Sequence, residues 1–481
     1  MTRTYITVSI PYVNAAPHVG YALELVEADA VARHRRARGE DVRFLGGTDD
    51  HAIKNALAAE AAGVPVADYV DANARRFEAL RRPLDISFDD FIRTSRDPRH
   101  VRGVEVLWRR SLATGDLYRG LYEGLYCVGC EQFYDAADLD DGRCPDHEIE
   151  VEPVREENWF FRLSAYTAPI RDALTSGRLR IVPESFAHEV LAQLDRGLVD
   201  ISVSRSVERA RGWGIRVPDD PSQVVYVWWE ALTNYVTALD VAEPTSQAYH
   251  RWWHDADERI HVIGKGILRF HAIYWPALLL STGQRLPTTI YVHPYLTAGG
   301  RKISKSLGNT VDPAEVIDRV GVDALRWWLL ADVPRAADAD YTDDRVSERA
   351  EVDLVNGVSN LAHRVLTIAH RPDRRLPAPR RHDLDLRDHV DAFDFRGAIG
   401  RINAFVRAAN AEVERTKPWQ LRTDDPAFDA VVGDLLGRLV ALAEALEPFV
   451  PDTADRLRRL VTADAHGRLP VPEPLHRRRP R

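Results

Sequence analysis

Lysines are rare in this chain, and most of them lie in two short glycine-bearing segments. Only five of the 64 basic residues are lysines, and three of those occur in 264–266 and 302–306. The ammonium of a lysine is a compact charge on a mobile stem, which suits a phosphate oxygen. Lys302 and Lys305, on either side of a serine, could neutralise charge that develops as pyrophosphate leaves a triphosphate. The pattern predicts a phosphate ligand, although a solvated basic loop would have the same composition.

A second phosphate-binding pattern follows the first apolar run of the chain. Pro17-His18-Val19-Gly20 lies between an expected strand and an expected helix. The helix N-terminus offers free N–H groups and a positive dipole, Gly20 permits close approach of the backbone, and His18 can donate to a phosphate oxygen. A histidine that caps a turn explains the same residues, but the presence of both patterns in one chain favours a phosphate or triphosphate ligand.

The three cysteines form a metal-binding pattern with one histidine. Cys127 and Cys130 have two residues between them, and Cys144 and His147 repeat this spacing. Two such pairs joined by a short hairpin suit tetrahedral zinc, and four protein ligands leave no open coordination position. The sequence therefore predicts a structural zinc rather than a disulfide scaffold. The alternative is that the cysteines are small buried hydrophobic residues.

The elements that must position these residues alternate between strand and helix in the first third of the chain. Apolar runs at 5–10 and 42–45 flank a helical pattern at 19–38. This order predicts a βαβ unit and a parallel sheet, whose ligands bind beyond the carboxyl ends of the strands. Strand signals of the same type return at 224–228, 259–263 and 289–293. After Tyr341 the pattern is helical to the end of the chain.

Length and composition bound the class of protein. The chain has 481 residues, of which 45% are hydrophobic, and this length suits two to four domains. No apolar run approaches the length of a membrane span, and the first residues lack the features of a signal peptide. A cytoplasmic protein with no membrane partner is therefore expected. The net charge of −9 argues against wholesale coating of nucleic acid but permits a local basic groove.

The two phosphate patterns resemble the HIGH and KMSKS signatures of class I aminoacyl-tRNA synthetases. Within that class the chain resembles the bacterial methionyl-tRNA synthetases over essentially its full length. The supporting segments are 11–18, 44–51, 158–163, 226–232 and 302–309. The zinc pattern is similar to the single Cys₃His knuckle of one branch of that family. The segment 116–222, expected to be an insertion in the catalytic domain, is too short for the editing domain of the isoleucine, valine and leucine enzymes.

The resemblance implies an α/β fold in which a zinc-binding insertion splits a Rossmann-type parallel-sheet catalytic domain, followed by an α-helical bundle. The expected catalytic halves are 1–115 and 223–345, the second with the lysine loop. The expected insertion is 116–222, with its zinc knuckle at 127–147. The expected anticodon-binding bundle, with a basic tail, is 346–481. No additional C-terminal oligomer-forming domain is expected, so the resemblance favours a monomer.

The resemblance also implies an activity, that of a methionine-tRNA ligase. Such an enzyme activates methionine with Mg-ATP to methionyl-adenylate and transfers it to tRNA(Met). The implied catalytic residues are His18, Tyr21, Lys302 and Lys305, and the implied ATP-binding residues are His18, Gly20, Lys265, Lys302 and Lys305. The implied methionine-binding residues are Ile10, Tyr12, Asp49, Trp228, Ala231, Leu232, Tyr235 and His271. Without the motifs, the aromatic residues of this set would be interpreted as ordinary core.

Three residues of the helical C-terminal part match the anticodon readers of the family. Asn360 and Arg364 are four apart and so share a helix face, and Trp419 follows Lys417 and Pro418. An aromatic ring with amide and guanidinium groups suits an unstacked base of a tRNA loop. The alternative for Trp419 is a residue of the helical core.

The chain departs from the family pattern at four positions near the expected site. Tyr21 replaces the second histidine of HIGH, and Gly266 replaces an acidic residue. Glu230 replaces aspartate and Pro294 replaces glycine. Two alternatives therefore stay open: a paralogue that forms an aminoacyl-adenylate for a non-tRNA acceptor, and a catalytically weak tRNA-binding regulatory protein.

Overall fold

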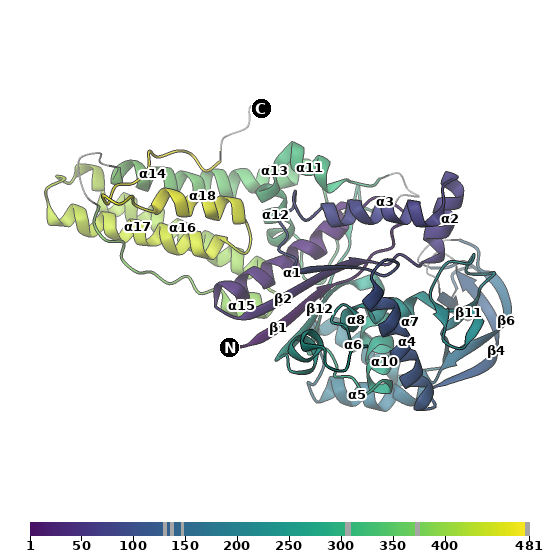
Figure 1. Ribbon diagram of the computed structural model, residues 1–481. Coiled ribbons are helices and arrows are strands. Elements are labelled where there is room, and N and C mark those ends of the chain that lie inside the picture. Colours follow the sequence, from purple (N-terminus) through teal and green to yellow (C-terminus); the bar gives the residue numbers. More distant parts are fainter. Residues whose placement is uncertain (128–131, 135–138, 146–148, 304–308, 371–375, 477–481) are drawn as a thin grey trace. The chain divides into compact units, whose positions relative to one another are not determined.

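The computed structural model describes residues 1–127, 132–134, 139–145, 149–303, 309–370 and 376–476 (Figure 1). The chain forms two compact units. The first unit comprises Met1–Pro17, Glu40–Arg81 and Phe88–His293, and the second comprises His18–Gly39, Arg82–Ser87 and Pro294–Arg481. Within the described residues, no helix is long and apolar enough to span a bilayer.

A six-stranded sheet forms the centre of the first unit, and all its pairings are parallel. Its strands are, in order across the sheet, β3 (Asp90–Arg93), β2 (Asp41–Thr48), β1 (Arg3–Val8), β12 (Glu258–Gly264), β13 (Thr289–His293) and β7 (Arg180–Val182). The central strands β1, β12 and β13 are almost wholly buried, as expected for aliphatic runs of a parallel sheet. The predicted parallel α/β sheet is confirmed.

The prediction that the strand at 224–228 belongs to the parallel sheet is wrong. Strand β11 (Asp220–Val225) pairs antiparallel with β9 (Ser204–Ser206) and β10 (Arg216–Val217). Helix α7 (Val227–Leu232) then begins directly after Tyr226. An apolar run of this length cannot distinguish a strand from a buried helical turn by periodicity alone.

The rest of the first unit consists of a second antiparallel sheet and short helices. The sheet has the order β5 (Gln132–Tyr134), β4 (Leu117–Cys127), β6 (Glu152–Phe161) and β8 (Ile201–Ser202). The α-helices are α2 (Ile53–Ala62), α3 (Val66–Ala79), α4 (Pro98–Ala113), α5 (Thr167–Thr175), α6 (Glu184–Asp195), α7, α8 (Asn234–Thr237), α9 (Gln247–Tyr249) and α10 (Trp275–Ser281).

The second unit is predominantly helical, as the sequence predicted for its C-terminal part. It contains α1 (Val19–Ala37), α11 (Pro313–Val320), α12 (Val322–Ala331), α13 (Asp343–Ala350), α14 (Asn360–Ala369), α15 (Arg387–Asp391), α16 (Phe395–Thr416), α17 (Pro426–Leu446) and α18 (Pro451–Val461). Helix α17 packs against α14, α16 and α18 (Figure 1). A small sheet of β15 (Arg301–Lys302), β14 (Leu296–Ala298) and β16 (Ala339–Asp340) completes the unit.

A buried ion pair fixes α1 within the second unit. The Nη2 atom of Arg326 lies 2.8 Å from Oδ2 of Asp29, and both side chains are fully buried. Arg326 Nε also donates to the carbonyl of Phe449 at 3.0 Å, next to the start of α18. Because a buried charge without its partner is strongly destabilising, this pair holds the helix that begins after His18.

Candidate active site

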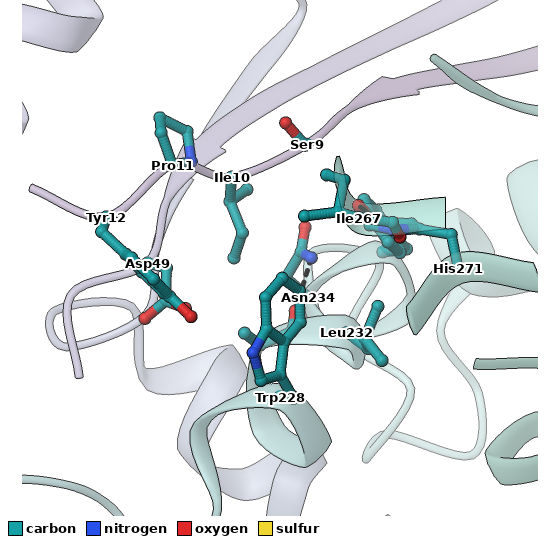
Figure 2. Close-up of a pocket in the computed structure, with 12 residues that line it drawn as sticks. Ser9, Ile10, Pro11, Tyr12, Asp49, Trp228, Leu232, Asn234, Ile267 and His271 are labelled. Atoms are coloured by element: carbon teal, nitrogen blue, oxygen red, sulfur yellow. Dashed lines mark hydrogen bonds between the residues drawn. The ribbon is translucent and has the colours of Figure 1, made fainter. Parts of the chain in front are cut away.

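One cavity of the first unit, of about 180 Å³, brings together all eight residues predicted to bind methionine (Figure 2). Its lining is Ser9, Ile10, Pro11, Tyr12, Asp49, Trp228, Ala231, Leu232, Asn234, Tyr235, Ile267 and His271. Figure 2 shows Tyr12 and Asp49 on one side and Ile267 and His271 on the other. The cavity therefore has a carboxylate at one side and an imidazole at the opposite side.

The carboxyl ends of β1 and β2 position the acidic side of the cavity. Asp49 forms a parallel bridge with Tyr12, and its N–H donates to the carbonyl of Pro11 at 2.9 Å. The side-chain amide of Asn55 donates to the carbonyl of Asp49 at 3.0 Å, and the His51 N–H donates to its Oδ1 at 3.2 Å. The backbone and one carboxylate oxygen of Asp49 are thus held in place.

Gly47 permits β2 to approach the residues that follow β1. A Cβ atom at this position would lie 2.5 Å from the carbonyl oxygen of Ile92 and 2.9 Å from Cγ2 of Ile10. Neither distance is compatible with a side chain, so only glycine allows Ile10 to occupy its place in the cavity wall.

The apolar wall of the cavity is a packed set of aromatic rings. Trp228 stacks on Phe270 with ring centres 3.6 Å apart and planes inclined by 6°. Tyr12 meets Trp228 edge-on at 6.1 Å. Aromatic surfaces are favourable neighbours of a polarizable thioether. The wall therefore has the chemistry expected for a methionine side chain.

His271, at the other side of the cavity, has a defined tautomer. His271 Nδ1 lies 3.0 Å from the carbonyl oxygen of Ile267, which can only accept, so this nitrogen carries a proton. In the neutral ring, Nε2 then accepts a hydrogen bond from the Tyr235 hydroxyl, 2.7 Å away. The Tyr235 hydroxyl is thus committed to His271.

A second buried histidine supports this pair from behind. Trp275 Nε1 can only donate, and it lies 3.0 Å from Nε2 of His261, which must therefore be unprotonated. Burial lowers the pKa of His261 well below its usual value, as the hydrogen bond requires. The ring of His261 lies 4.3 Å from that of Tyr235, measured between centres. A neutral imidazole adds no charge behind the cavity.

Glu230 lies in α7, the helix that also carries the cavity-lining Trp228, Ala231 and Leu232, and is fully buried. Its Oε2 lies 2.6 Å from Nε2 of His100, and its Oε1 lies 3.4 Å from Nδ1 of His51. Burial alone raises the pKa of Glu230, but His100 and His51 outweigh it and lower the pKa to about 2. A carboxylate that is one methylene longer than the family's aspartate therefore remains ionised in this place.

The N-terminus of α1 differs from the sequence prediction, because its N–H groups have partners. The Val19 N–H donates to the carbonyl of Val311 at 2.9 Å, and the Tyr21 N–H donates to that of His18 at 2.9 Å. The Gly20 N–H donates to Nδ1 of His18 at 3.1 Å. The predicted free N–H groups are therefore wrong for this structure. Since Nδ1 accepts, the proton of a neutral His18 is on Nε2, the atom that can donate to a phosphate.

Two of the three predicted ATP-binding lysines lie in described elements. Lys265 begins a short 3₁₀ turn (Lys265–Ile267) directly after β12, at the carboxyl end of the parallel sheet. Lys302 ends β15 in the second unit, and its backbone pairs with Thr297 of β14. Lys305 lies outside the described residues.

Comparison with known proteins identifies the family. The model of the class I tRNA synthetases (M) matches residues 4–153 and 134–366. The methionine–tRNA ligase of Brucella melitensis biotype 1 is 37% identical, over 98% of this chain and 97% of that protein. The chain belongs to the methionine family of class I tRNA synthetases. The methionine–tRNA ligase of Mycobacterium tuberculosis (strain CDC 1551 / Oshkosh) is 39% identical, over 96% of this chain and 92% of that protein.

A solved structure of this synthetase family has the same fold. The chain matches Mycobacterium tuberculosis methionyl-tRNA synthetase in complex with methionyl-adenylate with a TM-score of 0.91 and 37% sequence identity. The match covers 99% of this chain and 100% of that chain. The predicted α/β fold and family resemblance are confirmed, and family membership makes the chain an aminoacyl-tRNA synthetase.

The residues that match the anticodon readers of the synthetase family lie in the second unit. Asn360 is the first residue of α14 and is exposed, and Arg364 follows one turn later. Arg364 is held by Asn410 Oδ1 at 3.1 Å and by Glu414. Trp419 is 52% exposed, so the alternative that it is a core residue is wrong. An exposed tryptophan can stack on a base without rearrangement of the core.

Two of the four predicted zinc ligands of this synthetase are described. Cys127, at the end of β4, is fully buried, and Cys144 is 1% exposed. Both belong to a small core cluster with Tyr134, whose hydroxyl lies 3.6 Å from Sγ of Cys144. Cys130 and His147 lie outside the described residues. Among the described ones, a close group of possible metal ligands occurs instead at the exposed His250, His254 and Asp255.

Sequence reasoning missed four residues of the cavity: Ser9, Pro11, Asn234 and Ile267. Ile267 precedes His271 by four residues, and helical spacing could have indicated it. Asn234 adjoins Tyr235 in α8, but no periodic signal separates it from the buried residues around it. Phe270, which supports Trp228 from outside the cavity, could not be distinguished from ordinary core.

Proposed function

We propose that this chain is a methionine–tRNA ligase that uses the cavity around Trp228 for methionine. A carboxylate oxygen of methionine attacks the α-phosphorus of ATP, the bond to the β-phosphate oxygen breaks, and pyrophosphate leaves. A terminal ribose hydroxyl of tRNA then attacks the acyl carbon, and AMP leaves. The observation that carries the proposal is the convergence of all eight expected methionine-binding residues on one cavity.

Each wall of the cavity suits one part of methionine. Asp49 offers a carboxylate for the ammonium group, and a charge-assisted hydrogen bond of this kind is stronger than a neutral one. The aromatic wall at Trp228 suits the thioether. His271 and Tyr235 give the opposite side a fixed polar surface. Selectivity from the apolar walls alone is limited, because one methylene changes binding by about 1–3 kcal/mol.

The phosphate-binding segments supply the charge that the first step needs. His18 can donate through Nε2 to a phosphate oxygen, and Gly20 leaves space beside it. Lys265, Lys302 and Lys305 are the candidates for the triphosphate. Positioning and neutralisation of charge account for most of the acceleration of such a transfer. We include Tyr21 as a neutral donor in place of the usual histidine, and magnesium as the ATP counter-ion.

The exchange of pyrophosphate with ATP tests the first step directly. With each of the twenty amino acids in turn, we expect methionine to give by far the fastest exchange, without need of tRNA. Aminoacylation of tRNA(Met) then separates a ligase from a paralogue that serves a non-tRNA acceptor. Exchange with another amino acid, or none, would contradict the proposal and favour the paralogue or the regulatory protein.

The exposed Trp419 supports an anticodon-binding role for the second unit. With Asn360 and Arg364, it offers the groups that recognise an unstacked base. Trp419→Ala should weaken aminoacylation by about 1–3 kcal/mol, the usual contribution of a base stacked on an aromatic ring. Pyrophosphate exchange of the same variant should be unchanged. Equal damage to both reactions would show that Trp419 supports the fold instead.

The buried thiols of Cys127 and Cys144 fit a structural zinc site. Two thiols in one small apolar cluster are chemically suited to zinc, and with Cys130 and His147 they would complete a closed tetrahedral set. Metal analysis of protein purified without added zinc should give about one zinc per chain. Cys144→Ser should lose it, whereas His254→Gln, in the exposed group, should retain it. The reverse result would show that the zinc is bound by the exposed group of His250, His254 and Asp255.

The domain boundaries, the monomeric state and the cytoplasmic location remain predictions. Gel filtration with light scattering tests the second of these, and one chain per particle is the expected result.

A further inference from the structure

The hairpin that carries Lys302 turns through two consecutive glycines. Gly299 and Gly300 link β14 to β15, and both have positive φ, at 63° and 73°. This is the conformation of a tight two-residue hairpin turn. Lys302 is therefore only two residues from the turn, so the orientation of the turn determines where its backbone lies.

One carboxylate holds this turn at two points. Oδ1 of Asp340, the last residue of β16, accepts from the Gly300 N–H at 2.7 Å and from the Thr297 hydroxyl at 2.7 Å. Gly300 lies in the turn and Thr297 in β14, directly opposite Lys302. These two bonds lower the pKa of Asp340, so the side chain is charged at neutral pH. The bonds are therefore charge-assisted and stronger than neutral ones.

On the other side of Lys302, a buried residue anchors the chain. Ile303, the next residue, is only 5% exposed. The backbone of Lys302 thus lies between a buried anchor and a turn tied to Asp340. The backbone of Asp340 is placed by its pairing with Thr297 and by a hydrogen bond from Arg345 Nη1 to its carbonyl at 2.8 Å.

We propose that Asp340 is a positioning residue for adenylate formation, which acts by orienting the hairpin that presents Lys302 to the triphosphate. The inference rests on the proposed function and adds a residue that acts through the hairpin. Loss of the carboxylate frees the turn and leaves the methionine cavity unchanged, since that cavity is built from the first unit. The rate of adenylate formation falls, and methionine affinity does not.

Single-turnover adenylate formation by the full chain tests this role. Asp340→Ala should lower the rate constant about tenfold, a modest loss for misplacement of a catalytic group. The methionine dissociation constant, measured by tryptophan fluorescence, should stay within twofold. Asp340→Asn keeps an acceptor oxygen and should recover part of the rate. The matched control is Asp338→Ala, because Asp338 Oδ1 accepts from the Tyr295 N–H at 3.0 Å, one residue before β14 rather than in the turn.

A double-mutant cycle distinguishes positioning from general support of the fold. If Asp340 acts through Lys302, Asp340→Ala should cost less than twofold in a Lys302→Ala background. A tenfold loss in both backgrounds, or a parallel loss of methionine affinity and rate, would overturn the inference. An unchanged rate in Asp340→Ala would do the same. If the wild-type chain itself forms no methionyl-adenylate, the proposed function fails, and that outcome is recognisable before any variant is made.

Discussion

The methionine cavity and the phosphate-binding segments are built in different ways. In the first unit, side chains hold side chains: Trp228 stacks on Phe270, and the Tyr235 hydroxyl is hydrogen-bonded to His271. In the second unit, side chains hold the backbone: His18 accepts from the Gly20 N–H at the start of α1, and Asp340 accepts from the Gly300 N–H in the turn. Packed side chains fix the shape of a binding cavity, whereas a lysine stem is long and mobile and can follow a phosphate that moves.

This difference predicts which kinetic quantity each region controls. Changes in the cavity should alter methionine affinity, because they change contacts that the ground state already makes. Changes in the phosphate-binding segments should alter the rate of adenylate formation, because charge on the leaving pyrophosphate develops only in the transition state. The following four predictions test this division, from the largest expected effect to the smallest.

Lys305→Ala should produce the largest effect and confine it to the rate. Removal of a group that stabilises developing charge costs about 10²–10³ in rate, or roughly 3–4 kcal/mol. Pre-steady-state adenylate formation gives the rate, and tryptophan fluorescence gives the methionine affinity, which should not change. Arg301→Ala, a nearby exposed cation, is the matched control and should remain within about threefold. A raised KM for methionine with unchanged kcat would show that the cavity and the phosphate-binding segments do not control separate kinetic quantities.

The ionised Glu230 should make the first unit sensitive to acid. Because its folded pKa is lowered to about 2, Glu230 contributes stability above its unfolded pKa of about 4.3, and this is lost as pH falls towards 2. The contribution is up to about 3 kcal/mol, because a tenfold change in proton affinity between the unfolded and folded states corresponds to about 1.4 kcal/mol. Urea unfolding of wild type and Glu230→Gln should show a gap in free energy that narrows as the pH falls from 5 to about 2.5. A constant gap would show that the charge contributes nothing.

Tyr235→Phe should weaken methionine binding and leave the rate at saturation nearly unchanged. The change removes the hydrogen bond at 2.7 Å that orients the His271 imidazole in the cavity wall, so the ring must be ordered when methionine binds, at a cost of about 1 kcal/mol. Calorimetric titration with methionine measures the loss. Tyr166→Phe is the matched control: it also removes a hydroxyl, but its acceptor Asp116 keeps a hydrogen bond from Ser281 and lies outside the cavity. A rate defect without loss of methionine affinity would show that His271 acts in catalysis and not in methionine binding.

The sequence predicted the fold where a local pattern determines it. The helix expected at 19–38 is α1 (Val19–Ala37), and the run at 42–45 lies in β2. The run at 224–228 was placed in the wrong sheet, because the choice between two sheets depends on partners far away in the chain. The eight cavity residues came from family motifs, and spacing alone would not have assembled them.

The contacts that hold the motifs could not be predicted from the sequence. The pairing of the Gly20 N–H with Nδ1 of His18 depends on a side-chain rotamer, and Asp340 lies 40 residues from Gly300. Neither signal is periodic. A motif therefore identifies the chemistry of a segment, while the structure is needed to see what orients it.

In the sequence, Gly266 lies between Lys265, a predicted phosphate-binding residue, and Ile267, which lines the cavity. It is exposed in its 3₁₀ turn and is absent from the glycines with positive φ. A side chain is therefore compatible with the backbone, and a carboxylate here would remain solvated. A buried carboxylate without partners would be costly, but an aspartate at this exposed position would not be buried.

Gly266→Asp restores the acidic residue of the family and should accelerate methionine-dependent exchange a few-fold, which corresponds to about 1 kcal/mol or less. Gly266→Asn is the matched control, because it has the same size and no charge. If Asp accelerates and Asn does not, the missing carboxylate is a local defect in an otherwise intact synthetase. If both variants slow the exchange while the protein stays folded, the site has adapted to the smaller residue, and a repurposed substrate becomes the better explanation. Because the turn joins a lysine to a cavity residue, the split between kcat and KM also shows to which region position 266 belongs.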